Sequence, residues 1–270
     1  MARVKQLDVI VGSLKNLSFY TRKGSDQVFV RTKGGATKEQ IKRKPEFEAL
    51  RRNNKEFGGC SKMSKEIRNT FQPLVHVADY NLAPAICSLV KDIQKRDTES
   101  AVGERAIRLS AVRYVVAGFD FNRGVRFDSL LRVPLRWSLR REELCATLEV
   151  PAFACSFGLN LPPDIRYSLF RISASLGIAT DQCINASKTG YGQTHPSVGG
   201  IHRAVSTEWY STQASLPDVQ LSLDLSQGAP EFCDDDTLIL SIAVEFGTLD
   251  AFGNPTPVRG VGAGKVLGVG

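Results

Sequence analysis

The sequence predicts an α+β protein: an N-terminal β-hairpin arm and short helices, followed by a mainly antiparallel β-sandwich. Three observations predict this class. Two aromatic and β-branched runs flank a short polar loop within residues 17–33. Apolar residues then recur with helical spacing to about residue 95. From about Ser110 their period changes to two, with turn residues between the runs. We therefore expect a basic hairpin arm (1–35), a helical region (36–109) and a β-sandwich body (110–270).

The hairpin is expected from Leu17–Arg22 and Val28–Lys33, joined by the glycine-containing loop Lys23–Gln27. Neither run has a fully apolar face, because polar side chains share each side of the ribbon. An isolated two-stranded hairpin is marginally stable in water. We therefore expect it to pack on its own body or on a neighbouring molecule.

The helical region begins with a capping box at residues 37–40, where the Thr37 hydroxyl and the Gln40 side chain can satisfy each other's backbone N–H groups. Pro45 predicts a break near Lys44, and the pair Gly58-Gly59 predicts a helix stop. The expected helices are Pro45–Phe57, Ser61–Phe71 and Pro84–Lys95.

Five later runs are expected as strands of an antiparallel sandwich. They are Arg113–Val116, Gly124–Trp137, Arg166–Leu176, Val219–Leu225 and Leu238–Phe246. In the last run one face is fully apolar and consists of Leu238, Leu240, Ile242, Val244 and Phe246. The other face consists of Ile239, Ser241, Ala243 and Glu245. The glycine-rich end, Val258–Gly270, is either a closing strand or a flexible tail.

Composition excludes several classes of protein. Hydrophobic residues make up 42% of the chain, which is too many for a disordered protein. The first residues contain no apolar stretch of a secretory signal, and no run is long enough to span a membrane, so we expect a cytoplasmic protein without membrane contact. The six cysteines are scattered and read as reduced thiols: Cys60, Cys87, Cys145, Cys155, Cys183 and Cys233.

No motif predicts catalysis, a cofactor or a small-molecule substrate. The segment Gly262–Lys265 resembles a phosphate loop only superficially, since Arg259 and Val266 occupy two of the required positions. His195 and His202, with Cys183 or His76, match no compact zinc spacing and are expected as loop residues. The run Asp234–Asp236 lacks the alternation of a calcium loop and is expected as a solvated turn. We predict a non-enzyme, although distant residues could still assemble an acid–base pair.

The basic charge is confined to the first quarter of the chain. Residues 1–72 hold 17 Lys and Arg and 7 Asp and Glu, a net charge of +10, whereas the rest carries −3. Three interpretations are open: solvated helix faces, a nucleic-acid-binding arm, or an arm that packs on a neighbouring subunit. The residues expected at the intersubunit or polyanion contact are Phe19, Tyr20, Arg22, Lys23, Phe29, Arg31 and Lys33.

The first 70 or so residues resemble a group of uncharacterised bacterial proteins that begin with a hairpin-then-helix arm and continue into a variable β-rich body. The residues that carry the resemblance are Gly12–Tyr20, Val30–Gly35, Thr37–Ile41, Pro45, Phe47, Arg51 and Asn53. The plan is also similar to phage-like structural proteins. The resemblance implies an assembly component and supplies no catalytic residues.

We therefore predict a structural subunit that self-assembles into a ring, tube or filament through its N-terminal arm. Its expected partners are other copies of itself. The mildly acidic remainder of the chain would steer the docking of the basic arm. The alternative is a nucleic-acid-binding protein that uses the same basic arm.

Overall fold

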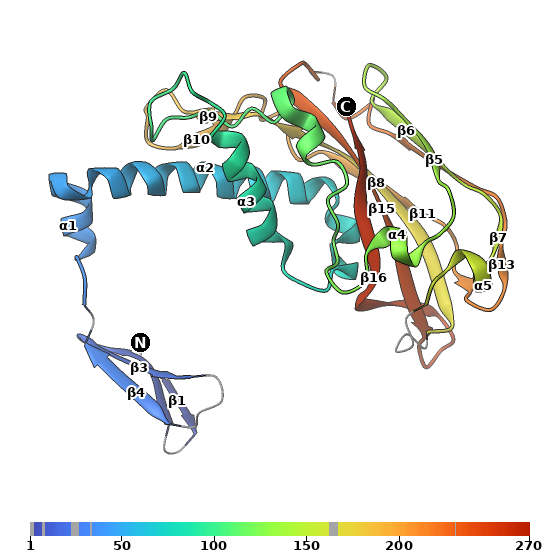
Figure 1. The fold of residues 1–270 in the computed structure, drawn as a ribbon, viewed down its shortest axis with the longest axis horizontal. Helices are drawn as coiled ribbons and strands as arrows, with labels where there is room; N and C mark the ends of the chain where they lie inside the picture. The colour runs from blue at the N-terminus through green and yellow to red at the C-terminus, as the bar shows by residue number, and fades with distance from the viewer. Residues whose placement is uncertain (1–2, 7–8, 23–26, 33, 162–166, 230) are drawn as a thin grey trace. The chain divides into compact units, whose positions relative to one another are not determined.

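A computed structural model of the chain describes residues 3–6, 9–22, 27–32, 34–161, 167–229 and 231–270. The fold is α+β, with N-terminal strands, a long helix and mostly antiparallel sheets that form a β-sandwich-like core (Figure 1). The predicted fold class is thus confirmed. The chain divides into two compact units, which we call the N-terminal unit (Met1–Arg51) and the C-terminal unit (Arg52–Gly270).

Four antiparallel strands form the N-terminal sheet, in the order β1-β2-β3-β4. Their bounds are β1 (Arg3–Gln6), β2 (Val9–Leu14), β3 (Leu17–Thr21) and β4 (Val28–Thr32). The predicted hairpin is present as β3 and β4, and most of its expected loop, residues 23–26, lies outside the described residues. Strands β1 and β2 enlarge the hairpin to a sheet, which the pattern of residues 17–33 does not predict.

The predicted capping box opens α1 (Lys38–Arg43). The Gln40 backbone N–H donates to Thr37 Oγ1 at 3.2 Å, and the Thr37 N–H donates to Gln40 Oε1 at 2.7 Å. Lys44 is extended, as expected before Pro45, and the short 3-10 helix η1 (Pro45–Phe47) follows. The chain then enters α2 (Glu48–Thr70).

Helix α2 runs without interruption, so the predicted stop at Gly58-Gly59 and the separate helix Ser61–Phe71 are wrong. Gly59 is buried where the ring of Tyr191 crosses the helix, and a Cβ there would lie 2.6 Å from Tyr191 Cγ. This glycine therefore permits a close contact rather than ending a helix. Tertiary packing outweighs the low helix propensity of the pair.

The predicted third helix is confirmed as α3 (Leu82–Gln94), whose N-cap is Asn81. Two segments predicted as strands are largely helical turns instead: η3 (Ser110–Val115) and α4 (Phe127–Leu130), while η2 (Gln72–Val77) precedes α3. Individual apolar side chains of these turns pack into the two cores. Val116, directly after η3, packs in the core beneath the helices, and Phe127 and Leu130 of α4 pack in the core of the sandwich. Such contacts override local strand preference.

Strands account for most of the remaining chain. Their bounds are β5 (Arg136–Arg140), β6 (Cys145–Val150), β7 (Phe153–Ala154), β8 (Leu169–Thr180), β9 (Gln182–Ile184), β10 (Tyr191–Gln193), β11 (His202–Ser206), β12 (Tyr210–Ser211), β13 (Ser215–Leu216), β14 (Val219–Asp224), β15 (Asp236–Leu249) and β16 (Pro255–Val269), with α5 (Cys155–Gly158) after β7. The predicted strands at 166–176, 219–225 and 238–246 are confirmed as β8, β14 and β15.

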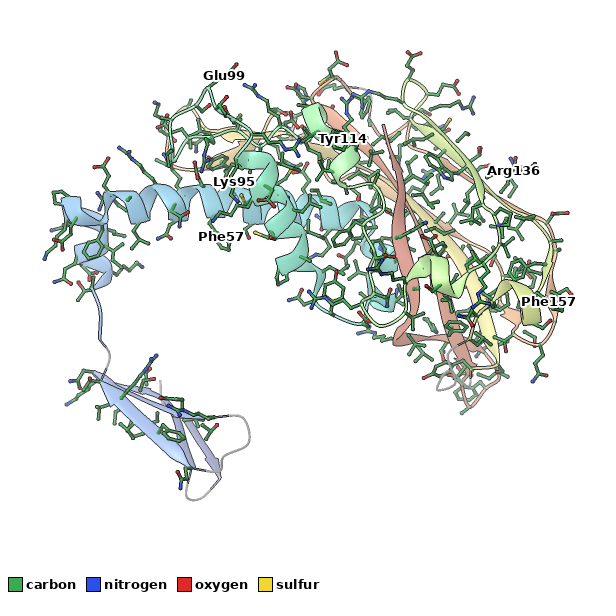
Figure 2. All side chains as sticks on the ribbon, in the orientation of Figure 1. Phe57, Lys95, Glu99, Tyr114, Arg136 and Phe157 are labelled. Carbon is green, nitrogen blue, oxygen red and sulfur yellow. The ribbon has the colours of Figure 1, made fainter. Side chains whose placement is uncertain are left out.

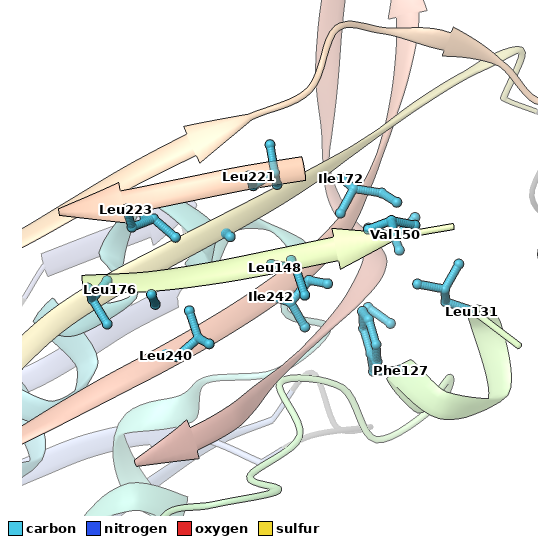
Figure 3. Packing of buried hydrophobic residues seen from close by; sticks show 14 of the residues in the cluster. Phe127, Leu131, Leu148, Val150, Ile172, Leu176, Leu221, Leu223, Leu240 and Ile242 are labelled. Atoms are coloured by element: carbon cyan, nitrogen blue, oxygen red, sulfur yellow. The ribbon is translucent and has the colours of Figure 1, made fainter. Parts of the chain in front are cut away.

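A central sheet in the order β11-β8-β15-β16, with β12 also paired to β8, divides the C-terminal unit into layers. The sheet β14-β6-β5 covers one face, and α2 and α3 cover the other (Figure 1). Alternate residues of β15 serve the two sides: Leu240 and Ile242 pack beneath β6 (Figure 3), whereas Ile239 and Ala243 pack under the helices. Both faces of β15 are therefore buried from Asp236 to Gly247.

The glycine-rich end is a closing strand of its own sheet. β16 pairs with β15 in antiparallel register, with Leu240 opposite Gly268 and Ala243 opposite Gly264. The Trp137 ring lies against Gly268, and a Cβ on Gly264 would come 2.6 Å from the Phe121 ring. Lys265 lies in this strand and pairs with Asp128, so the segment is not a phosphate loop.

The helices and the strands from residue 52 onward share one core-forming unit, because α2 and α3 pack directly on the central sheet. The structure thus divides the chain at Arg51/Arg52. All six cysteines are free thiols, with Cys60 and Cys155 buried and the other four partly buried. Among the described residues, no helix is both long enough and apolar enough to cross a membrane.

Candidate functional site

The N-terminal sheet has two faces of different chemistry. In the register of β3 and β4, Tyr20 lies opposite Phe29 and Phe19 lies opposite Val30. Directly opposed residues share a face, and successive residues alternate. Tyr20 and Phe29 therefore lie on one face, and Phe19 and Val30 on the other.

The first face, which we call the aromatic–basic face, consists of Tyr20, Arg22, Phe29 and Arg31. The rings of Tyr20 and Phe29 stack at 5.8 Å with 28° between their planes. The Arg22 guanidinium carbon lies 4.4 Å from the Phe29 centroid, and that of Arg31 lies 5.6 Å from the Tyr20 centroid. These are cation–π contacts, which hold two positive charges over adjacent rings.

The second face, which we call the apolar face, consists of Leu14, Leu17, Phe19 and Val30. Leu14 lies opposite Leu17 in the pairing of β2 with β3. Leu14 and Val30 are 57% and 53% exposed. From Val11 to Arg51 no described residue is buried, so this face has no covering layer within its unit. It is a continuous apolar strip on a sheet with open edges.

The seven residues predicted for the contact thus divide into groups. Tyr20, Arg22, Phe29 and Arg31 come together on the aromatic–basic face, and Phe19 lies on the apolar face. Lys23 and Lys33 lie outside the described residues. Sequence reasoning missed Leu14, although its alternation with Gly12 in a β-branched segment was a usable signal.

The C-terminal unit also exposes large apolar side chains on separate elements. Phe157 on α5 is 83% exposed and Phe252, in the turn before β16, is 89% exposed. Phe57 on α2 is exposed as well, and Figure 2 shows Phe57 and Phe157 far apart on this unit. Apolar groups this far apart offer more than one contact surface.

The buried charges of the C-terminal unit serve the fold. Glu245 accepts hydrogen bonds from His76 Nε2 at 3.0 Å and from Arg171 Nη2 at 2.7 Å. Burial would raise the pKa of Glu245, but hydrogen bonds led by that from His76 outweigh it and lower the pKa. Burial does raise the pKa of Glu66, whose carboxylate accepts from the Thr180 N–H at 2.7 Å. These groups join α2 and η2 to the central sheet.

His195 and His202 do not form a common site with Cys183 or His76, the ligand set considered from the sequence. His76 contacts Glu245, and His202 Nδ1 lies 3.1 Å from the Gly200 carbonyl oxygen. His195 instead meets Cys233 and Asp236. Asp236 is fully buried, so the expectation of a solvated turn at Asp234–Asp236 is wrong for its last residue. A Cys and an Asp three positions apart before a strand were the available signal.

No protein-family model, curated protein or solved structure matches the chain. The resemblance of the first 70 or so residues to a group of uncharacterised bacterial proteins, and the similarity of the plan to phage-like structural proteins, therefore stay predictions.

Proposed function

We propose that this chain is a non-enzymatic structural subunit that assembles with copies of itself through its N-terminal sheet. The observation that carries the proposal is the uncovered apolar face of that sheet, formed by Leu14, Leu17, Phe19 and Val30. A covering surface on another copy would bury this face. The product would be a ring, tube or filament, as in phage-like assemblies.

Burial energetics favour a partner for this sheet. A sheet of three or more strands gains independent stability by packing a hydrophobic face, and no described residue of this unit from Val11 onward is buried. Covering an apolar side chain contributes about 25 cal/mol per Å² of apolar area. The exposed halves of Leu14 and Val30 are therefore an unused source of association energy.

Chain organisation favours another copy as that partner. The N-terminal sheet belongs to a separate compact unit, and Gly34 and Gly35 follow its last strand, with Gly35 at φ +102°. When one surface of a subunit docks on a different surface of the next, the contact repeats into a ring or filament. Residues 1–51 hold 12 Lys and Arg and 5 Asp and Glu, a net charge of +7, whereas residues 52–270 hold 23 of each. Acidic side chains on the next copy would steer the docking of this basic unit.

The chemistry of the cysteines supports assembly in a reducing compartment. All six thiols are free, and structural disulfides are rare where thiols are kept reduced. We accordingly propose the cytoplasm as the site of assembly.

Nucleic acid is a second candidate partner, and the aromatic–basic face favours it. Tyr20 and Phe29 offer stacked rings, while Arg22 and Arg31 add two positive charges beside them. Single-stranded nucleic acids bind to such combinations of aromatic platforms and basic grooves. This interaction would use the opposite face of the sheet from self-assembly, so the two functions can be separated by mutation.

Light scattering coupled to size-exclusion chromatography tests the assembly proposal. The unmodified chain should form oligomers, and Val30→Asp on the apolar face should reduce them to monomers because it places a charge in the interface. Ser13→Asp is the matched control: it adds the same charge to the same sheet on the other face. Deletion of residues 1–35 should also give monomers. Unchanged oligomers in V30D, or a monomeric unmodified chain at high concentration, would contradict the proposal.

Salt dependence tests the alternative. Binding to single-stranded DNA or RNA should weaken steeply as salt rises above about 50 mM, because each neutralised phosphate releases a counterion. The double substitution Arg22→Gln with Arg31→Gln should reduce the slope by about two, while Val30→Asp should leave binding unchanged. Absence of binding to both DNA and RNA at low salt would contradict a nucleic-acid-binding function.

A further inference from the structure

We propose that His195, Cys233 and Asp236 bind one zinc ion, with a water molecule as the fourth ligand. This site lies in the C-terminal unit and is independent of the proposed assembly surface. It would join the segment between β10 and β11 to the start of β15.

The three side chains come from two segments that are distant in sequence. Cys233 Sγ lies 3.0 Å from His195 Nδ1, and His195 Nδ1 lies 3.5 Å from Asp236 Oδ1. One ligand atom of each residue lies within 4.8 Å of the other two. A thiolate, an imidazole and a carboxylate are the ligand types that zinc takes in proteins.

A buried polar atom without a partner points to the same place. Asp236 is 0% exposed, and its Oδ2 accepts a hydrogen bond from the Cys233 N–H at 2.9 Å. Its Oδ1 has no hydrogen-bond partner and faces His195 Nδ1. An unsatisfied buried carboxylate oxygen is costly, and coordination to a cation removes that cost.

The spacing of the cluster is close to that of a tetrahedral zinc site. Standard zinc–ligand bond lengths place a sulfur and a nitrogen ligand about 3.6 Å apart and a nitrogen and an oxygen ligand about 3.4 Å apart. The Nδ1–Oδ1 separation of 3.5 Å already fits. The Sγ–Nδ1 pair at 3.0 Å must open by about 0.6 Å, which a side-chain rotation of the half-buried Cys233 can supply.

The arrangement does not fit a nucleophile–base–carboxylate relay. In such a relay the nucleophile contacts one imidazole nitrogen and the orienting carboxylate contacts the other. Here Cys233 Sγ and Asp236 Oδ1 both approach Nδ1, while Nε2 lies 3.7 Å from the sulfur. The three ligand atoms lie within 4.8 Å of one another, a grouping that a single ion can hold.

Two arginines hold the backbone that presents Cys233 and Asp236. Arg141 donates to the carbonyl oxygens of Cys233 at 2.7 Å and Asp236 at 2.8 Å, and Arg113 donates to that of Asp234 at 2.6 Å. These bonds fix the turn before an ion arrives. A Cys233 thiolate and the Asp236 carboxylate carry one negative charge each, which balances the double charge of the ion itself.

The cluster can be reached from solvent. Cys233 lines a pocket of about 430 Å³ together with Arg141, Leu144, Phe232 and Asp234. Of the three ligands, Cys233 lines this pocket, and the His195 side chain is 34% exposed. An ion and its water can therefore reach the cluster at these two residues. A site with three protein ligands and one open position is the form that zinc adopts where it binds an exchangeable ligand.

Metal analysis of the full-length chain, free of any purification tag, tests the proposal. The protein is stripped with EDTA, reloaded with zinc, dialysed and measured by mass spectrometry of the metal, and we expect about one zinc per chain. Replacement by cobalt should give a thiolate-to-cobalt charge-transfer band. Cys233→Ser should abolish that band, whereas the control Cys183→Ser should retain it.

A second pair of variants assigns the histidine. His195→Ala should weaken zinc binding by more than the roughly 100-fold that loss of an outer-shell partner costs, and His202→Ala should leave it unchanged. Zinc should also raise the unfolding temperature of the unmodified chain, a readout that does not depend on the variants folding. A chain that retains no zinc and shows no such rise, or a charge-transfer band that persists in C233S, would overturn the assignment.

Discussion

The N-terminal sheet and the central sheet are both antiparallel, yet they differ in how far their residues are buried. Every residue of β15 from Asp236 to Gly247 is buried, whereas none of the described residues 11–22 and 27–32 of the N-terminal sheet is. The central sheet lies between the helices and a second sheet, whereas the described residues of the N-terminal unit provide no covering layer for the N-terminal sheet. Strand-forming residues alone therefore do not bury the faces of a sheet, because burial needs a second packed layer. We infer that another copy of the chain supplies this layer for the N-terminal sheet.

The largest expected difference between the two sheets is the response to loss of an apolar side chain. Leu240→Ala in β15 leaves a cavity in the sandwich core and should lower the free energy of unfolding by about 2–5 kcal/mol. Val30→Ala in β4 should change it by less than about 0.5 kcal/mol when the chain is monomeric, because Val30 is half exposed. Urea unfolding at low protein concentration measures both. Equal losses of stability in the two variants would show that Val30 is as well packed in the monomer as Leu240.

Two neighbouring glycines of α2, Gly58 and Gly59, should respond in opposite ways to replacement by alanine. Gly59→Ala would place a Cβ 2.6 Å from the Tyr191 ring and should lower the free energy of unfolding by about 1–3 kcal/mol. Gly58→Ala meets no atom within 4 Å and should raise it by about 0.5–1 kcal/mol, through higher helix propensity. Thermal unfolding of the two variants should shift in opposite directions. A shift in the same direction would show that α2 does not approach Tyr191 this closely.

The stability of the C-terminal unit should depend on pH through the His76–Glu245 pair. The hydrogen bond to Glu245 raises the pKa of His76 above its ordinary 6.5, so the stability it contributes is present below pH 6.5 and lost as the pH rises through the raised value. The pKa of Glu245 lies below its ordinary 4.5, so its contribution is lost only as the pH falls through that lowered value. The pair should therefore stabilise the fold most between these two ordinary values.

His76→Gln tests this pair directly. Its destabilisation relative to the unmodified chain should shrink as the pH is raised from 6 toward 8, as measured by urea unfolding at several pH values. A difference that stays constant over this range would contradict a protonated His76 bound to Glu245.

The smallest expected effect is that of removing the N-terminal strands from the monomer. Deletion of residues 1–35 removes no residue of either buried cluster, so the free energy of unfolding of the remainder should change by less than about 0.5 kcal/mol. Chemical unfolding monitored by tryptophan fluorescence reports on Trp137 and Trp209, which both lie in the C-terminal unit. A large loss of stability would mean that the two units support each other.

Local patterns in the sequence predicted the elements that local chemistry controls. The capping box at Thr37, the break at Pro45 and the alternation in β14 and β15 all depend on neighbours within a few residues. The uninterrupted α2 depends instead on Tyr191, which lies far along the chain. The turns at η3 and α4 likewise form because their apolar residues fill cores that other segments build.

The candidate surfaces show the same limit. The aromatic and basic residues of β3 and β4 were predicted as a contact, and cross-strand register then separates Phe19 from Tyr20 and Phe29. The Cys233 and Asp236 pair was visible in the sequence, but its contact with His195 was not, because His195 lies 38 positions before Cys233. Only the fold brings these two segments together.

Hydrogen–deuterium exchange at two protein concentrations tests most directly whether another copy covers the N-terminal sheet. Peptides from β3 and β4 should exchange rapidly in dilute protein and gain protection as concentration rises, because assembly covers their apolar face. Peptides from β15 should be protected at both concentrations and serve as the internal reference. Exchange of β3 and β4 that is the same at both concentrations, while light scattering shows oligomers in the concentrated sample, would contradict assembly through this sheet.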